Sequence, residues 1–154
     1  MNERKYAFLE RAVALREQES GPDHMATAYV LLDLAKALHL DGDLEAAEPK
    51  YTRAVDILSR HLGADHPSLW DIWRMLCRIR RRLGDLEGAR SAGEWALATC
   101  RPGTAAAMFR MIELAGVLEL LGAAEEAERL QREALRIHRR NFPRDALEDR
   151  MARW

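Results

Sequence analysis

The stretch RAVALREQESGPDH, residues 11–24, returns 42 positions later as RAVDILSRHLGADH, residues 53–66. Six of the fourteen aligned positions carry the same residue, with Arg-Ala-Val at the start and Gly-x-Asp-His at the end. A fixed period between 20 and 50 residues is typical of chains built by stacking one structural unit. The sequence therefore predicts a repeat array, and the rest of the chain can be divided by the same period.

A second series of glycines supports this division. Gly42, Gly84 and Gly122 follow one another at intervals of 42 and 38 residues. Apolar and small residues recur at helical spacing on both sides of each glycine. Before the glycine they are Leu31, Leu34, Ala35 and Leu38 in the first unit and Met111, Leu114, Ala115 and Leu118 in the third; after it they are Ala47, Tyr51 and Ala54, then Ala127, Leu130 and Ala134. Each unit is thus predicted to be a helix, a tight glycine turn and a second helix.

Short polar residues mark where these helices begin. Asp43 and Asp85 lie beside the turn glycines, where an aspartate can accept hydrogen bonds from the first free amides of a helix. Asp23 and Asp65 are expected to cap the helices that follow the two longer loops. Pro67 lies at a first-turn position, where a missing N–H does no harm.

These signals predict an all-α fold, a stack (α-solenoid) of antiparallel helix pairs with no strand. The predicted helices are residues 3–19, 25–40, 44–61, 67–82, 86–100, 104–121, 124–141 and 146–153, the last with a capping box from Asp145 to Glu148. The whole chain is read as a single domain. It comprises an N-terminal half-repeat at 3–20, repeats at about 25–61, 67–100 and 104–141, and a short C-terminal helix at about 146–153.

Composition limits the possible functions. The 154 residues are 48% hydrophobic and 32% charged, with a formal net charge of −1, the mixture of a soluble globular protein. This balance argues against nucleic acid as a partner, and no apolar run is long enough to span a bilayer. Cys77 and Cys100 lack metal-ligand spacing, and a disulfide between them is not expected. We expect a reduced, cytoplasmic protein.

No catalytic motif is present. His24 and His66 each follow an aspartate, but they recur at the repeat period, whereas a catalytic group is needed only once. They are interpreted as structural residues of the loops. Phosphate-binding loops, nucleophile motifs and His-Glu-x-x-His are missing from the sequence. The sequence therefore predicts a protein that is not an enzyme and that has no metal or cofactor.

The repeat unit resembles the tetratricopeptide repeat of kinesin light chains and their bacterial relatives. The resemblance rests on the long period, the loop GADHP at 63–67, the phrase EAAEPKYTRAVDIL at 45–58, and the pattern formed by Leu31, Leu34, Ala35, Leu38, Ala47 and Tyr51. It covers residues 6 to 142. It implies a right-handed superhelix whose first helices line a concave groove that binds proteins or peptides. Arg80 and Gly93 in the middle unit and Gln131 in the third depart from the pattern, and the middle unit is expected to be looser.

The family pattern also indicates a binding site. Arg74, Arg78 and Arg81 lie at i, i+4 and i+7 of one helix, hence on one face, and the pattern places that face in the groove. Lys36 is the first-unit counterpart of Arg78, while Tyr29 and Phe109 flank the cationic centre. The resulting hypothesis is a peptide- or partner-binding site formed by Tyr29, Lys36, Arg74, Arg78, Arg81 and Phe109 that prefers acidic segments. The alternative is a solvated helix face that is neutralised by Asp33, Asp71, Glu113 and Glu119.

Three functions remain open at this point. The leading hypothesis is a non-enzymatic protein–protein interaction scaffold that holds a peptide or partner segment. The alternatives are a regulatory or peptide-sensing segment of a larger signalling protein and an oligomerisation module. The last would use the N-terminal helix at 3–19, whose apolar residues have no partner beyond the first unit: Tyr6, Phe8, Leu9, Val13 and Leu15.

Overall fold

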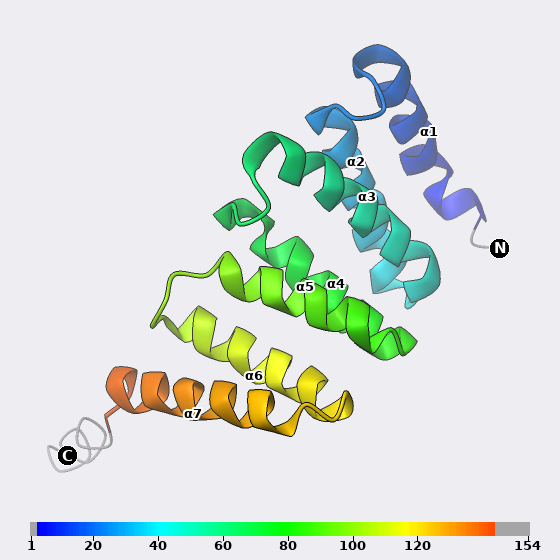
Figure 1. Cartoon of the computed structure of the whole chain (residues 1–154). Helices are drawn as coiled ribbons and strands as arrows, with labels where there is room; N and C mark the ends of the chain where they lie inside the picture. The colour runs from blue at the N-terminus through cyan, green and yellow to red at the C-terminus, as the bar shows by residue number, and fades with distance from the viewer. Residues whose placement is uncertain (1–2, 144–154) are drawn as a thin grey trace, which may run out of the picture.

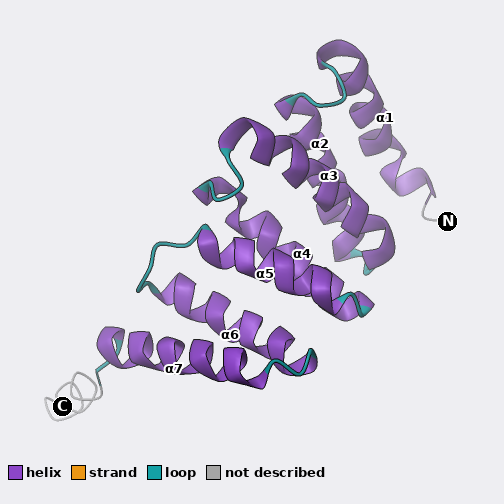
Figure 2. Ribbon diagram, in the orientation of Figure 1, coloured by secondary structure: helices purple, strands orange, loops and turns teal. Residues whose placement is uncertain are grey.

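The computed structural model describes residues 3–143, and in that range it contains seven α-helices, one short 3-10 helix and no strand (Figure 2). The helices are α1 (Glu3–Ser20), α2 (Met25–Leu40), α3 (Leu44–Leu62), η1 (Pro67–Leu69), α4 (Trp70–Leu83), α5 (Leu86–Ala98), α6 (Ala105–Leu120) and α7 (Ala124–Asn141). The predicted helices up to residue 141 agree with these bounds to within two residues, except that η1 forms the start of the fourth. The predicted helix at 146–153 lies outside the described residues.

The helices stack in chain order as antiparallel pairs (Figure 1). Helix α2 pairs with α3, α4 with α5, and α6 with α7, while α1 packs on α2 without a pairing helix of its own. Contacts between α3 and α4 and between α5 and α6 join successive pairs. Helices α1 and α7 therefore lie at opposite ends of the stack, and the all-α repeat fold predicted from the sequence is confirmed.

Small residues at the crossing points let the paired helices approach closely. Ala35, Cys77 and Ala115 occupy equivalent positions in α2, α4 and α6, and all three are buried. Ala47 and Ala54 of α3 are fully buried opposite α2. Larger apolar side chains fill the space around these contacts, so the apolar period of the sequence becomes a continuous core. Both cysteines are free thiols, as expected.

The tight turns have the predicted geometry. Gly42, Gly84 and Gly122 have φ angles of 83°, 84° and 78°, the left-handed conformation that glycine adopts without steric strain. Asp43 Oδ1 accepts from the Ala46 amide at 3.1 Å, and Asp85 Oδ1 accepts from the Gly88 amide at 2.9 Å. These two aspartates are the predicted caps of α3 and α5.

The prediction for the longer loops was wrong by one residue. His24 caps α2 through Nδ1, which accepts from the Ala26 amide at 3.1 Å, and His66 caps η1 in the same way from the Ser68 amide at 3.2 Å. The histidine, not the preceding Asp23 or Asp65, is the last extended residue before the helix. Only a side chain at that position can reach back to the amide two residues on. The recurrence of the histidines thus reflects a capping role, and Pro67 follows at the first helical position as predicted.

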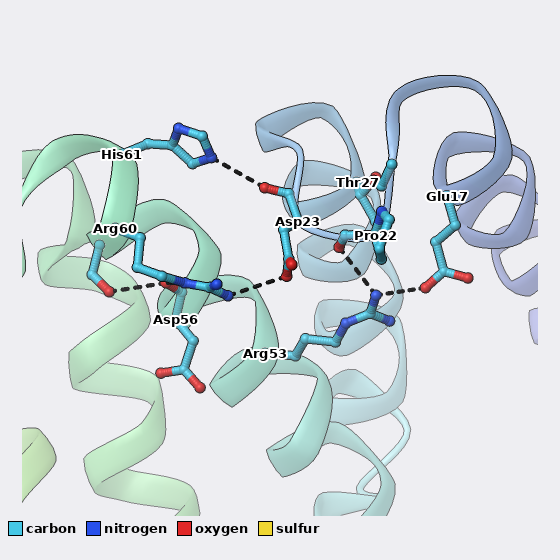
Figure 3. Close-up of polar contacts among 10 residues, drawn as sticks. Glu17, Pro22, Asp23, Thr27, Arg53, Asp56, Arg60 and His61 are labelled. Atoms are coloured by element: carbon cyan, nitrogen blue, oxygen red, sulfur yellow. Dashed lines mark hydrogen bonds and ion pairs between the residues drawn. The ribbon is translucent and has the colours of Figure 1, made fainter.

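The first loop is fastened to α3 by polar contacts (Figure 3). Arg53 pairs with Glu17 of α1 at 2.6 Å and donates to the carbonyl oxygen of residue 22 at 3.1 Å. Arg60 pairs with Asp23 at 3.1 Å, and the ring Nε2 of His61 lies 3.1 Å from the Asp23 carbonyl oxygen. These contacts join α1, the loop and α3 into one unit, which explains the role of Asp23 once its capping role is excluded.

Arg80 replaces an apolar residue of the repeat without leaving a gap. It occupies the position of Leu38 and Leu118, and it forms hydrogen bonds to the neighbouring helix α3. Its Nε lies 2.8 Å from Glu48 Oε1, and its Nη2 lies 2.9 Å from Thr52 Oγ1. A charged network therefore links α4 to α3 where the other units use leucine packing.

Gly93 replaces the aromatic residue of the repeat and leaves space for its neighbours. A Cβ atom built at Gly93 would lie 3.0 Å from Leu114 Cδ1 and 3.3 Å from Cys77 Sγ. The aromatic contact of this unit lies nearby instead, where Trp73 and Trp95 stack with ring centroids 6.0 Å apart. The departures at Arg80 and Gly93 are therefore accommodated by local contacts.

Candidate binding groove

A cavity of about 420 Å³ lies between the first helices of the three units. Helix α2 contributes His39, α4 contributes Arg78, Arg81 and Arg82, and α6 contributes Glu113 and Val117. Its volume is within the range of small-ligand sites, about 300–1,000 Å³. The groove that the family pattern implies is thus hollowed at α4, and three arginines of that helix are part of its lining.

Glu113 partly neutralises this lining. Its Oε1 lies 2.9 Å from Arg78 Nε, and its Oε2 lies 2.7 Å from Nη1 of Arg110 in the same helix. The side chain of Arg110 is 11% exposed, whereas that of Arg78 is 54% exposed. Glu113 therefore links a buried arginine to one that remains accessible from solvent.

Arg81 and Arg82 have no such partner. Within residues 5–143, neither guanidinium has a carboxylate oxygen at ion-pair distance. Arg81 extends toward α6, because a Cβ built at Gly116 would lie 3.7 Å from Arg81 Nη1. Gly116 is the counterpart of Lys36 and Arg78, and its lack of a side chain leaves room beside α6 for the Arg81 guanidinium.

His39 at the edge of the cavity is affected by the same arginines. Its pKa is lowered, first by burial of the ring and then by the positive charges of Arg82 and Arg78. Its ring meets Tyr51 edge-on, with centroids 6.3 Å apart. His39 is therefore a neutral group at neutral pH, with a ring N–H that is available as a hydrogen-bond donor.

Arg74 is positioned differently from the other two predicted arginines. Its Nη2 lies 2.6 Å from Asp71 Oδ1, three residues earlier in α4, and its guanidinium lies 5.4 Å from the ring centroid of Trp70. It does not line the cavity of Arg78 and Arg81. The structure thus brings Arg78 and Arg81 together, while Arg74 is neutralised within its own helix.

The remaining predicted residues lie around this centre. Tyr29 and Lys36 line a smaller cavity of about 140 Å³ between α2 and α4, together with Asp71. Phe109 on α6 lies outside both cavities and is 55% exposed. Tyr29 is similarly exposed, at 52%. The two aromatic rings therefore present apolar surface on the helices that flank α4.

Sequence reasoning left Arg82 out of the site and underestimated Glu113. Arg82 follows Arg78 by four residues, so its helical spacing could have indicated the same face. Glu113 appeared only as one of several acidic residues that could neutralise the arginines. Its pairing with Arg78 across 35 residues depends on how α6 packs against α4, for which the sequence gives no local signal.

Other chemistry is not evident in the described part of the chain. No group of three or more His, Cys, Asp or Glu residues within it is arranged to hold a metal ion. None of its helices is long and apolar enough to cross a membrane. Burial and then the charge of Glu113 raise the pKa of the Cys77 thiol, so it is protonated at neutral pH and a poor nucleophile.

Comparison with known proteins agrees with this architecture. The sequence model of the tetratricopeptide repeat matches residues 6–60 and again residues 110–145, together more than half of the chain. The chain belongs to the tetratricopeptide repeat family. The segment between the two matches contains the unusual Arg80 and Gly93. No curated protein matches the sequence.

The fold of this chain is similar to solved structures of kinesin-light-chain-like repeat proteins. BtubC (BKLC) from P. vanneervenii matches with a TM-score of 0.71 and 22% identity over 86% of this chain, which spans 54% of that protein. A Podosopora anserina protein of nearly identical TPR-like repeats, named after kinesin light chain, matches with a TM-score of 0.55 and 16% identity, covering 92% of this chain and 89% of its own. A point variant of the same fungal protein gives the same TM-score. Because the sequence identities are 16–22%, these matches show a similarity of fold alone.

Proposed function

We propose that this chain is a non-enzymatic interaction module that holds an acidic segment of a partner protein in the groove formed by α2, α4 and α6. Tetratricopeptide repeats mediate protein–protein interactions, which defines the general class. The observation that supports an acidic partner is the pair Arg81 and Arg82. Both line an open cavity, and neither guanidinium has a carboxylate of the described residues at ion-pair distance.

The electrostatics of the groove favour this ligand. A guanidinium binds a carboxylate through two parallel hydrogen bonds, and a charged hydrogen bond contributes about 1.5–3 kcal/mol when it is shielded from water. Arg81 and Arg82 can form such bonds without breaking an existing ion pair. Arg78 would first have to share or lose Glu113, and Arg74 would have to leave Asp71. The strongest contribution is therefore expected near the C-terminal end of α4.

The half-exposed Tyr29 and Phe109 supply the apolar part of the proposed site. Each lies on a first helix next to α4, so a bound segment that follows the groove would pass at least one of these rings. A suitable partner segment would then combine acidic residues with at least one apolar side chain.

The proposal can be tested with a partner identified by affinity capture and mass spectrometry. That partner is titrated against wild type, Arg81→Glu and Arg132→Glu at low and high salt, and all three proteins are melted. Arg132 lies on α7, is 71% exposed and is paired with Glu128, so it is a matched charge control. We expect Arg81→Glu alone to weaken binding by at least about tenfold, with the larger effect at low salt. Equal binding by all three proteins would refute the groove site.

A further inference from the structure

The charge of the cavity indicates a more specific ligand than a carboxylate. Three arginines and one glutamate line it, so its lining carries a net charge of +2 while His39 is neutral. A single carboxylate would neutralise half of this charge. A phosphomonoester carries a charge of about −1.5 to −2 at pH 7 on one compact group. The match in charge is therefore better for a phosphate group than for an aspartate or glutamate side chain.

The arrangement of donors supports the same conclusion. Arg78, Arg81 and Arg82 lie at i, i+3 and i+4 of α4, positions whose Cβ atoms are about 5–6 Å apart on a helix. Three guanidinium groups on one helical patch can reach the three terminal oxygens of one phosphate. The neutral His39 faces them across the cavity from α2 and can donate one further hydrogen bond.

The cavity has room for such a group. Gly116 on α6 has no side chain, unlike its counterparts Lys36 and Arg78, and the Arg81 guanidinium lies beside it. The cavity of about 420 Å³ exceeds the space that one carboxylate needs.

We infer that the Arg78–Arg81–Arg82 cavity binds a phosphorylated serine or threonine side chain of the partner segment. The inference rests on the proposed function, because it assumes that the groove holds a protein segment. It adds a condition: the partner binds tightly once it is phosphorylated, and Arg81 and Arg82 read the phosphate.

The test uses labelled pentapeptides with blocked ends and the sequence Ala-Leu-Xaa-Leu-Ala, in which Xaa is phosphoserine, aspartate or serine. Binding is followed by fluorescence anisotropy at constant ionic strength, with inorganic phosphate as a competitor. We expect the phosphoserine peptide to bind about tenfold more tightly than the aspartate peptide, the ratio that one additional charged hydrogen bond gives. Arg81→Gln/Arg82→Gln should reduce that ratio to near one, and Arg132→Gln should leave it unchanged. Melting curves establish that each variant is folded.

The outcomes separate the two proposals. If the aspartate peptide binds through Arg81 and Arg82 and the phosphoserine peptide binds no better, the phosphate inference is overturned and the proposed function stands. If all three peptides bind alike in wild type and the double variant, both are overturned. Undetectable binding of the phosphoserine peptide at millimolar concentration overturns the inference. Inorganic phosphate that competes at the Kd of the phosphopeptide would assign the cavity to free phosphate and overturn the link to a partner protein.

Discussion

Replacing Arg80 with methionine tests whether the middle unit is held by charge where the others are held by packing. Methionine keeps an unbranched apolar stem but removes the guanidinium and its hydrogen-bond donors. The side chains of Arg80 and Glu48 are 17% and 25% exposed, so the substitution leaves a largely buried carboxylate without its cation. Breaking one side of such a pair is destabilising, whereas replacing both partners with apolar residues is often neutral.

The contacts set the expected magnitude. The hydrogen bond between Arg80 and Glu48 is 2.8 Å long. Because both side chains are partly exposed, it should contribute about 1.5 kcal/mol, the lower end of the range for charged hydrogen bonds. The bond to Thr52 at 2.9 Å adds roughly 0.5–1 kcal/mol. Arg80→Met should therefore lower the free energy of unfolding by about 2 kcal/mol. For a chain of this length the melting temperature should fall by about 4–8 °C.

Urea denaturation of wild type, Arg80→Met, Glu48→Met and the double variant gives a double-mutant cycle. The coupling energy should be at least about 1 kcal/mol, and the double variant should be more stable than Arg80→Met alone. Arg132→Met, which removes an exposed arginine on α7, should change stability by less than about 0.5 kcal/mol. An Arg80→Met protein as stable as wild type would show that the charged network adds nothing to the packing of α4 on α3.

Three further predictions concern the ends and loops of the array. Hydrogen bonds from Lys5 and then Tyr6 lower the pKa of Asp41. The stabilising contribution of Asp41 is therefore complete above the usual carboxylate pKa and is lost as the pH falls through the lowered value. In urea denaturation Asp41→Asn should lose less stability in acid than wild type, and equal losses would contradict this. His66→Ala should lower the free energy of unfolding by about 1 kcal/mol, and His66→Asn by much less, because asparagine can also cap a helix. Equal effects of the two substitutions in urea denaturation would exclude the capping role. Phe8 is 79% exposed on α1, so self-association through this helix should appear in analytical ultracentrifugation and disappear in Phe8→Glu; a wild-type monomer at high micromolar concentration would rule it out.

Local sequence determined the helices and turns of this protein. The turns at residues 42, 84 and 122 have left-handed backbone, which glycine adopts without strain, and Asp43 and Asp85 beside two of them cap the next helix. These interactions span four residues or fewer, so their signals appear in consecutive letters of the sequence. The one-residue error at His24 and His66 shows the limit, because both the aspartate and the histidine of each loop can accept hydrogen bonds. Backbone conformation decides which of them lies before the helix.

Tertiary structure decided the charges of the groove. Spacing along α4 placed Arg74, Arg78 and Arg81 on one face, and Arg74 pairs with Asp71 three residues earlier in the same helix. The partner of Arg78, by contrast, comes from α6, and the Arg81 guanidinium lies beside Gly116 of that helix. Coulomb interactions depend on distance in space, and the packing of α6 on α4 fixes those distances. The fold of this chain therefore follows from its repeat period, whereas the pairing of Arg78 with Glu113 follows only from how the repeats pack.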